Sequence, residues 1–209
     1  TTSAEVERIL QQPSAQIRGD VNALMAMLSP AAEPYLEQMA QQASNLTKQR
    51  FGHNISLFIP MYLSNLCANE CDYCGFTMSN KIKRKILNKQ EIQQEIDIVK
   101  NFGFDAILLV TGEHESKVGI DYFAKVLPHT KQHFSHVSLE VQPLKTDEYK
   151  RLINLGLDAV MLYQETYQPT IYAKHHTRGN KKDFSYRLNS PDRLGQAGVD
   201  KIGLGVLLG

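Results

Sequence analysis

The sequence predicts an α/β fold: a partial (βα) barrel of about five parallel strands joined by crossover helices, preceded by an N-terminal helical segment. From residue 54 onward, short apolar runs alternate with stretches of helical period, which indicates a parallel sheet whose crossovers are helices. A glycine, an apolar residue and an aspartate recur at 103–105, 156–158 and 198–200, each between a helix and an apolar run. The spacings of 53 and 42 residues each suit a strand, a helix and their loops.

Composition narrows the class of protein before any motif is considered. The 209 residues are 42% hydrophobic and 22% charged, as in soluble globular proteins. A net charge of +1 argues against bulk nucleic-acid binding, which relies on a concentrated positive field. The sequence shows neither an apolar run near the roughly 20 residues of a membrane span nor a signal peptide. Together with three clustered cysteines that suit a reducing compartment, these features lead us to expect a cytoplasmic protein with no membrane or nucleic-acid partner.

Residues 1–50 are predicted to form a helical lead-in, and residues 51–209 the N-terminal part of the barrel. Val6, Ile9 and Leu10 recur with the helical period. A second short helix is expected over 21–28, where Ser29-Pro30 ends it, and a third over 34–50.

The first barrel strand is predicted over 54–59, where strand-forming residues alternate until Pro60 ends the run. Residues 61–80 then form a long loop. A loop that leaves the carboxyl end of a strand is where β/α folds place their chemistry.

Helices and strands alternate through the rest of the sequence. Asn88 and Glu91 form a capping box that begins the next helix, and Gly103 suits the left-handed residue that ends it. A continuous apolar run over 105–110 predicts a second strand buried on both faces. The other predicted elements are helix 120–132, strand 137–141, helix 146–155, strand 159–163, a loop at 164–189, helix 191–197 and strand 201–207.

The strand count predicts that the chain is part of a longer barrel. A closed β/α barrel has eight strands in about 250 residues, and only five are predicted here. The sequence begins with Thr1 rather than Met and ends inside an apolar run. We therefore expect the C-terminal strands to follow residue 209.

The three cysteines all lie in the loop at 61–80, as Cys67, Cys71 and Cys74. Thiolates this close in sequence can converge on one soft metal centre. On a four-iron cluster, three thiolates leave one iron without a protein ligand. Such an iron is a place to bind and activate another molecule.

Three other interpretations of the cysteines compete. A disulfide would leave one cysteine over. Structural zinc needs a fourth ligand, and the nearest histidines, His53 and His114, are distant in the sequence. The cysteines could also be small buried hydrophobic residues. The Cys-x3-Cys-x2-Cys spacing, with Tyr73 before the last cysteine, favours the iron–sulfur cluster.

This motif resembles that of the radical S-adenosylmethionine (SAM) enzymes, which carry it on the loop after the first strand of a β/α barrel. The resemblance implies that Cys67, Cys71 and Cys74 hold a [4Fe-4S] cluster whose open iron binds SAM. The segment Thr111-Gly112-Glu113 resembles the Gly-Gly-Glu segment that holds the amino group of SAM, with Thr111 in place of the first glycine. A glycine there lets the backbone approach its ligand closely.

The same resemblance implies further SAM contacts. Tyr73 corresponds to the aromatic residue near the adenine, and Leu207 to an apolar contact with the adenine from the fifth strand. Glu165 corresponds to the acidic residue that binds the ribose hydroxyls. Arg187 corresponds to the arginine that pairs with the SAM carboxylate, a role for which Arg178 is the rival.

Two polar segments receive weaker predictions. The densest charge run, residues 81–85, would ordinarily be a solvated face, although Asn80 and Arg84 could brace the cysteine loop. His175 and His176 lie in a polar segment where histidines are usually exposed, so the sequence assigns them no role.

Within the superfamily, the chain resembles the tyrosine lyases of thiamin thiazole biosynthesis over nearly its whole length. The segments that carry this resemblance are 63–69, 74–76, 78–85, 110–114, 140–144, 163–167 and 200–205. It implies cleavage of the Cα–Cβ bond of L-tyrosine to 2-iminoacetate and p-cresol, with 5′-deoxyadenosine and methionine formed from SAM. The implied partners are thiazole synthase, which takes the product, and an electron donor such as flavodoxin or ferredoxin.

Two alternatives stay open at this point. The tyrosine lyase of hydrogenase maturation starts with similar chemistry but adds a second cluster on a C-terminal extension, which is not visible here. A zinc-binding interaction module, from a different class, would use the same cysteines. Residues that contact tyrosine are not assigned, because barrel substrates are held by several strand ends. We therefore expect residues 1–209 alone to make no p-cresol.

Overall fold

A computed structural model describes residues 1–208, apart from the side chains at 14 and 15. The chain divides into two compact units, Thr1–Ile55 and Ser56–Gly209. Each unit has its own cluster of buried hydrophobic residues. None of the helices described is both long enough and apolar enough to cross a membrane.

The first unit is helical, as its period predicts. Its elements are α1 (Ser3–Leu10), α2 (Ser14–Ile17), α3 (Val21–Met27), the 3-10 helix η1 (Pro30–Tyr35) and α4 (Leu36–Phe51). Val6, Ile9 and Leu10 of α1 are buried against Ala23 and Ala26 of α3. The small alanine side chains let the two short helices approach closely.

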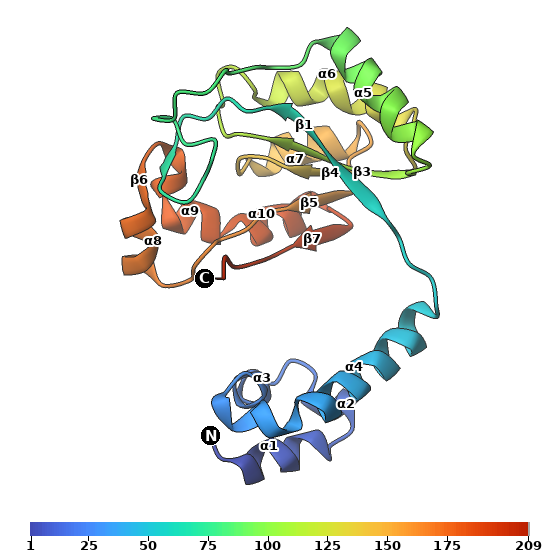
Figure 1. Ribbon diagram of the computed structural model, residues 1–209, viewed down its shortest axis with the longest axis vertical. Coiled ribbons are helices and arrows are strands. Elements are labelled where there is room, and N and C mark those ends of the chain that lie inside the picture. The colour runs from blue at the N-terminus through green and yellow to red at the C-terminus, as the bar shows by residue number, and fades with distance from the viewer. Residues whose placement is uncertain (209) are drawn as a thin grey trace. The chain divides into compact units, whose positions relative to one another are not determined.

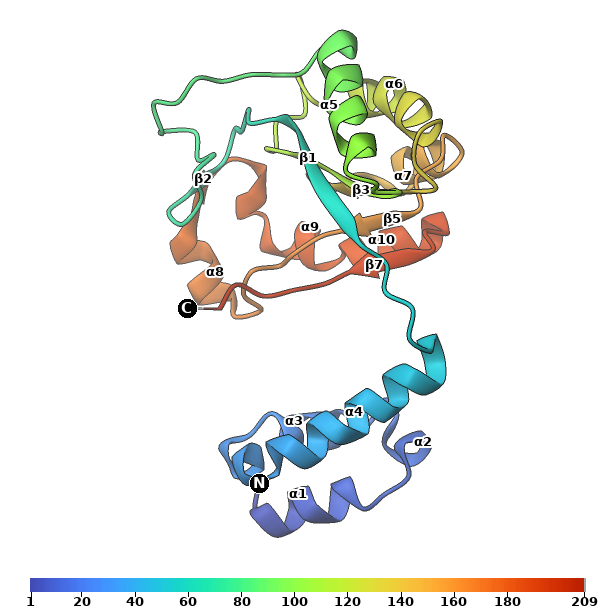
Figure 2. The same ribbon diagram turned by 45° about the vertical axis from the view of Figure 1, so that its right-hand side comes forward.

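The second unit is built on a five-stranded parallel sheet in the order β1-β3-β4-β5-β7, which confirms the partial barrel (Figures 1 and 2). The strands are β1 (Phe58–Ser64), β3 (Ala106–Thr111), β4 (His136–Glu140), β5 (Ala159–Met161) and β7 (Lys201–Gly203). The crossover helices are α5 (Lys89–Asn101), α6 (Ile120–Lys131), α7 (Thr146–Ile153) and α10 (Ser190–Ala197). Every strand pairing in this sheet is parallel, as helical crossovers require.

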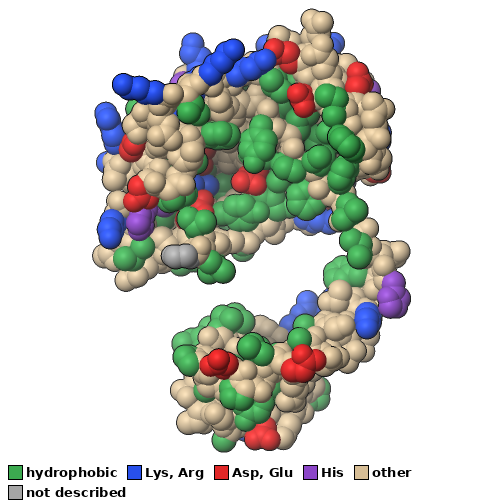
Figure 3. Space-filling model, viewed as in Figure 1, with side chains coloured by type: hydrophobic (Ala, Val, Ile, Leu, Met, Phe, Trp, Pro, Cys, Tyr) green, Lys and Arg blue, Asp and Glu red, His purple; other side chains and the backbone are tan. Residues whose placement is uncertain are grey.

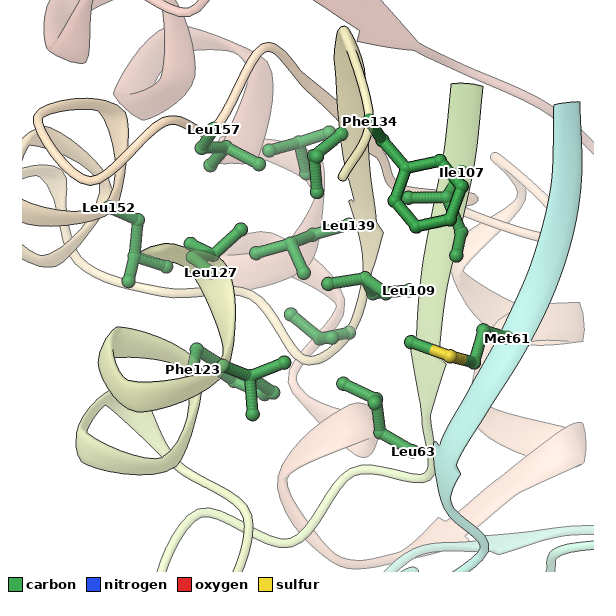
Figure 4. Packing of buried hydrophobic residues seen from close by; sticks show 14 of the residues in the cluster. Met61, Leu63, Ile107, Leu109, Phe123, Leu127, Phe134, Leu139, Leu152 and Leu157 are labelled. Atoms are coloured by element: carbon green, nitrogen blue, oxygen red, sulfur yellow. The ribbon is translucent and has the colours of Figure 1, made fainter. Parts of the chain in front are cut away.

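The core lies between the helices and one face of the sheet. Ile107 and Leu109 of β3 are fully buried there with Leu139 of β4, and alternate residues of each strand face the other way. Phe123 and Leu127 of α6 pack against them (Figure 4). The opposite face of the sheet is the concave side of the partial barrel.

Local signals fix the helix ends. The predicted capping box forms at the start of α5, between Asn88 and Glu91. The three glycines of the repeated junction, Gly103, Gly156 and Gly198, have φ of +83°, +103° and +86°. Each occupies the left-handed region that ends a helix and turns the chain into the next strand.

The structure corrects the predicted bounds of the first and last strands. Strand β1 begins at Phe58 and includes Pro60, which the sequence placed after its end. Because β1 pairs only with β3 among the strands described, it is an edge strand, and an edge strand tolerates a residue without an N–H. Strand β7 ends at Gly203, and Val206 forms an isolated bridge with Glu165.

The segment 164–189, predicted as a loop, carries regular structure. It contains α8 (Pro169–His175), β6 (His176–Arg178), the 3-10 helix η2 (Asn180–Lys182) and α9 (Phe184–Leu188). Pro169 begins α8 and the Asp183 carboxylate caps α9, both ordinary start signals in a short helix. Strand β6 pairs antiparallel with β2 (Glu70–Cys71), which lies inside the cysteine loop.

Candidate active site

The three cysteines lie on the loop that follows β1 and line one cavity of about 240 Å³. Cys71 is buried, Cys67 and Cys74 are half-buried, and all three are free thiols. Burial raises the pKa of the Cys71 thiol to about 11, although Lys181 lowers it. Within residues 1–208, no group of three His, Cys, Asp or Glu side chains is placed to hold a single metal ion. In a [4Fe-4S] cluster each thiolate binds a different iron, so its ligands surround a space instead of meeting at a point.

Arg84 braces the cysteine loop, which confirms the weaker of the two interpretations of the charge run. Its guanidinium donates to four backbone carbonyls, those of Asn65 (2.7 Å), Phe76 (2.9 Å), Thr77 (2.7 Å) and Asn80 (3.1 Å). The Asn80 side-chain amide donates to the Gly75 carbonyl at 3.0 Å. These bonds satisfy polar backbone groups in a segment with little regular structure.

His176 also holds the cysteine loop in place. The sequence predicted an exposed side chain here, and that prediction is wrong. Only 2% of His176 is exposed, and it lies opposite Cys71 in the β2–β6 pair. Its Nδ1 lies 2.8 Å from the Tyr172 carbonyl, which can only accept, so Nδ1 carries the proton. Its Nε2 therefore accepts from the Tyr73 hydroxyl, 2.6 Å away. Burial lowers the pKa of His176, in keeping with this neutral ring.

The Thr111-Gly112-Glu113 segment docks directly on the cysteine loop. A Cβ at Gly112 would lie 2.2 Å from the Leu66 carbonyl oxygen and 3.1 Å from Cys67 Cβ. The Ala68 amide donates to the Glu113 carbonyl at 2.8 Å. The glycine is thus required for the close approach of two backbone segments, in addition to any approach to a ligand.

Glu113 and Arg187 form a buried ion pair beside the cysteines. Arg187, 6% exposed, donates to a Glu113 carboxylate oxygen at 2.8 Å and to the Tyr163 carbonyl at 2.7 Å. The Asn69 side chain donates to the other Glu113 oxygen at 2.8 Å. Burial raises the pKa of Glu113, but the charges of Arg187 and Lys181 outweigh it and hold the pKa below its ordinary value. The rival arginine, Arg178, is exposed on β6 and does not line the cavity that contains the cysteines.

Glu165 has a left-handed backbone, with φ of +69°. Apart from glycines, no other residue of the described chain has positive φ. Its carboxylate accepts from Lys181 Nζ at 2.9 Å, and its carbonyl accepts from the Leu207 amide at 2.9 Å. Such a conformation costs energy and persists where the surroundings impose it, often at functional sites.

The predicted SAM contacts occupy two adjoining cavities. Gly112, Glu113 and Arg187 line the first with the cysteines, whereas Leu207 lines a second of about 440 Å³. Tyr73 and Glu165 line both. A ligand longer than either cavity could therefore extend past these two side chains, with its polar end near the cysteines.

Three residues of this site had no prediction from the sequence. Asn69 joins Glu113 to the amide of Lys181, and Lys181 pairs with Glu165. Glu140, at the end of β4, also lines the first cavity. The position of Asn69 between two cysteines was a signal for its role, but Lys181 lies in a segment that carries no motif.

Comparison with known proteins places the chain in a family. The model of the radical SAM superfamily matches residues 61–209, which hold the whole site. The chain belongs to the radical SAM superfamily. Enzymes of this superfamily use a [4Fe-4S] cluster and SAM, which are therefore the cofactors of this radical SAM chain.

Two curated relatives match the whole chain. The 2-iminoacetate synthases of Salmonella typhimurium and Escherichia coli are each 56% identical to it over 208 residues. This covers 100% of the radical SAM chain and 54% of each relative, so the chain spans about half their length. The 3-methylornithine synthase of Methanosarcina acetivorans is 29% identical over 72% of the chain and 44% of the relative.

Solved structures agree on the fold. HydG, described as a maturase of the [FeFe]-hydrogenase, superposes with a TM-score of 0.88 at 29% identity, over 99% of this chain and 47% of HydG. HydG from Carboxydothermus hydrogenoformans gives 0.77 at 28% identity, over 98% and 52%. Methylornithine synthase gives 0.70 at 22% identity, over 98% and 55%, and supports the fold alone.

The donor set of the first cavity fits both cofactors of the superfamily. Three thiols suit iron, which is soft enough for sulfur ligands. Glu113 suits an ammonium and Arg187 a carboxylate, so this pair complements the charges of an amino acid such as the methionine part of SAM.

Proposed function

We propose that the full-length protein is a 2-iminoacetate synthase: a radical SAM lyase that cleaves the Cα–Cβ bond of L-tyrosine to 2-iminoacetate and p-cresol. The observation that carries the proposal is the 56% identity to two curated synthases along the whole chain. The cavity supports it, because cysteines, an ion pair and an apolar wall meet at the carboxyl edge of the sheet.

In this proposal Cys67, Cys71 and Cys74 hold the cluster and leave one iron open. The cofactors, when bound, supply an electron and the 5′-deoxyadenosyl radical that takes a hydrogen atom from the substrate. The chain itself supplies binding, orientation and a site shielded from water. Arg84 and His176 keep the cysteine loop in place through the bonds described above.

The charged residues would orient SAM. Glu113 would accept from its ammonium, and Arg187 would donate to its carboxylate. Glu165 accepts from the ribose hydroxyls, with Lys181 beside it. Tyr73 and Leu207 contact the adenine, and the hydrogen bond to His176 fixes the ring of Tyr73.

The proposal extends to partners and location. Thiazole synthase takes the unstable imine, and flavodoxin or ferredoxin supplies the electron. The protein works in the cytoplasm, where the reducing conditions preserve thiols such as the three found here.

A second candidate is the tyrosine lyase activity of a hydrogenase maturase, favoured by the TM-score of 0.88 with HydG. The identity to HydG is 29%, against 56% to the synthases, so the synthase is better supported. A zinc-binding module has no comparable support, because the family match covers the cysteine loop.

The test is to give the full-length, anaerobically reconstituted protein SAM, a reductant and L-tyrosine, and to measure p-cresol and 2-iminoacetate. We expect both products, in equal amounts, together with 5′-deoxyadenosine. Cleavage of SAM without p-cresol would leave a radical SAM enzyme that acts on another substrate. A second iron–sulfur cluster in the full-length protein would favour the maturase.

A further inference from the structure

Glu140 lies at the end of β4, the central strand of the sheet. Along β4, Val137 and Leu139 are buried in the core on the helical side. Because strand side chains alternate, Glu140 faces the concave side, where it lines the first cavity with the cysteines. The sequence assigned this residue no role, and the cofactor contacts proposed above do not use it.

Glu140 differs from the other carboxylates of the cavity in having no cationic partner. Glu113 is paired with Arg187 at 2.8 Å, and Glu165 with Lys181 at 2.9 Å. Within the described part of the chain, the Glu140 carboxylate makes no ion pair and no hydrogen bond. Burial, and then the charge of Glu165, raise the pKa of Glu140 against the opposing effects of Lys181 and Arg187. A half-buried carboxylate of this kind is stabilised when a cationic ligand arrives.

The walls around Glu140 are apolar and aromatic. Tyr62, Val110 and Met161 line the cavity from the neighbouring strands β1, β3 and β5. The rings of Tyr62 and Phe76 meet edge to face, with centroids 5.9 Å apart. Figure 3 shows hydrophobic side chains gathered on the visible face of the second unit, with a few acidic side chains among them. Such a wall suits an aromatic ring, and the unpaired carboxylate within it suits a cationic group on the same ligand.

We propose that Glu140 binds the ammonium group of the substrate, an amino acid with an aromatic side chain. This inference rests on the proposed function and adds to it a residue that selects an α-amino acid over its deaminated analogue. SAM also carries an ammonium, and Glu113 already faces the cysteines with Asn69 and Arg187 around it. The test therefore has to separate the two possible sources of the cation.

The experiment compares the equilibrium binding of two ligands to the wild type and to variants of the full-length protein. The cluster is reconstituted and SAM is present, but the reductant is left out so that no turnover occurs. Dialysis gives the Kd of L-tyrosine and of 3-(4-hydroxyphenyl)propionate, which lacks only the ammonium. We expect the wild type to prefer tyrosine by about tenfold or more, as for hydrogen bonds to charged groups. Glu140→Gln should remove most of this preference by weakening tyrosine binding and leaving the analogue unchanged.

Controls separate the outcomes. Glu95→Gln, on the exposed face of α5, should retain the preference, and the Kd of SAM should be the same in all three proteins. Glu140→Asp keeps the charge and should keep part of the preference, which covers the case that Glu140→Gln fails to fold. Two results would overturn the inference but leave the proposed function standing. One is a Glu140→Gln protein that prefers tyrosine as strongly as the wild type does. The other is a Glu140→Gln protein with a higher Kd for SAM and an unchanged preference for tyrosine. Failure of the wild type to bind tyrosine would overturn the proposed function as well.

Discussion

Arg84 and Gly112 both shape the cysteine loop by the way they contact its backbone. Arg84 donates to four carbonyls, and Gly112 leaves room for the Leu66 carbonyl. Neither role needs a ligand to be present, so both can be tested on the apoprotein as well as on the loaded enzyme.

Replacement of Arg84 by Lys should loosen the cysteine loop. The planar guanidinium reaches four carbonyls at once, whereas the compact ammonium of a lysine cannot reach all of them. We expect the free energy of unfolding to fall by about 1–3 kcal/mol and less iron to be retained after reconstitution. Iron analysis and urea unfolding measure the two effects. Lys83→Ala, at an exposed position in the same run, is the control, and equal iron in Arg84→Lys and wild type would count against the brace.

Gly112→Ala should displace the cysteine loop, because its Cβ would lie 2.2 Å from the Leu66 oxygen. Overpacking against backbone costs about 1–3 kcal/mol, and we expect the iron content to fall with it. Gly195→Ala is the matched control, since a Cβ there meets nothing within 4 Å and an alanine favours the helix. Thermal unfolding of both variants decides: a Gly112→Ala protein as stable as Gly195→Ala would contradict the close approach.

At the residue scale, the motif predicted the cysteines, and the structure gathers them with Tyr73, Glu113 and Arg187 around one cavity. The cysteine site could be predicted from the sequence because its three cysteines lie close together on one loop. The partnership of Tyr73 with His176 spans 103 residues, and no local pattern encodes such a contact. The role of Glu140 could not be predicted for the same reason. Its lack of an ion-pair partner depends on where the other charged residues of the cavity lie in the folded chain.

Among the elements, β/α units were the most predictable part. Apolar runs and helix caps predicted β3, β4, α5 and α6 to within about two residues. The segment 164–189 was less predictable, because α8, β6 and α9 are short and β6 has its pairing partner, β2, in the distant cysteine loop. Its pairing with β2 is a tertiary effect, as is the tolerance of β1 for Pro60.

Asp158, just before β5, joins α6 to β4, and its carboxylate should make the stability of this junction depend on pH. Its carboxylate accepts from Lys131 at the end of α6 at 2.6 Å and from the Val137 amide of β4 at 2.7 Å. Burial raises the pKa of Asp158, but these bonds outweigh it and hold the pKa below its ordinary value. The bonds therefore stabilise the fold above the unfolded pKa of about 3.9, and the stabilisation is lost as the pH falls through the folded pKa.

Asp158→Asn should accordingly lower the free energy of unfolding at pH 7 by about 1–3 kcal/mol, and the difference from wild type should shrink in acid. Urea unfolding over a pH series measures it. Asp121→Asn removes an exposed ion pair with Arg151 and should cost less than about 0.5 kcal/mol. A difference for Asp158→Asn that stays constant down to about pH 3 would show that the carboxylate charge is not what stabilises the junction.

For the whole molecule, the chain spans 54% of each curated synthase, and the sheet described has five strands, where a closed barrel has eight. Substrates of such barrels are held by several strand ends, so residues 1–209 alone should yield no p-cresol where the full-length protein yields it readily. Chromatography of parallel reactions with SAM, reductant and tyrosine compares the two. Product from the shorter chain at a similar rate would show that five strands suffice.

In the proposed enzyme, three cysteines hold an iron–sulfur cluster with one iron open to SAM. The most direct measurement is the electron paramagnetic resonance spectrum of the reduced, reconstituted full-length protein, with and without SAM, beside its iron and sulfide content. We expect about four irons and four sulfides per chain and a spectrum that SAM changes, and we expect Cys71→Ala to lose both the bound iron and the cluster spectrum. Zinc in place of iron, or a cluster spectrum that SAM leaves untouched, would contradict it.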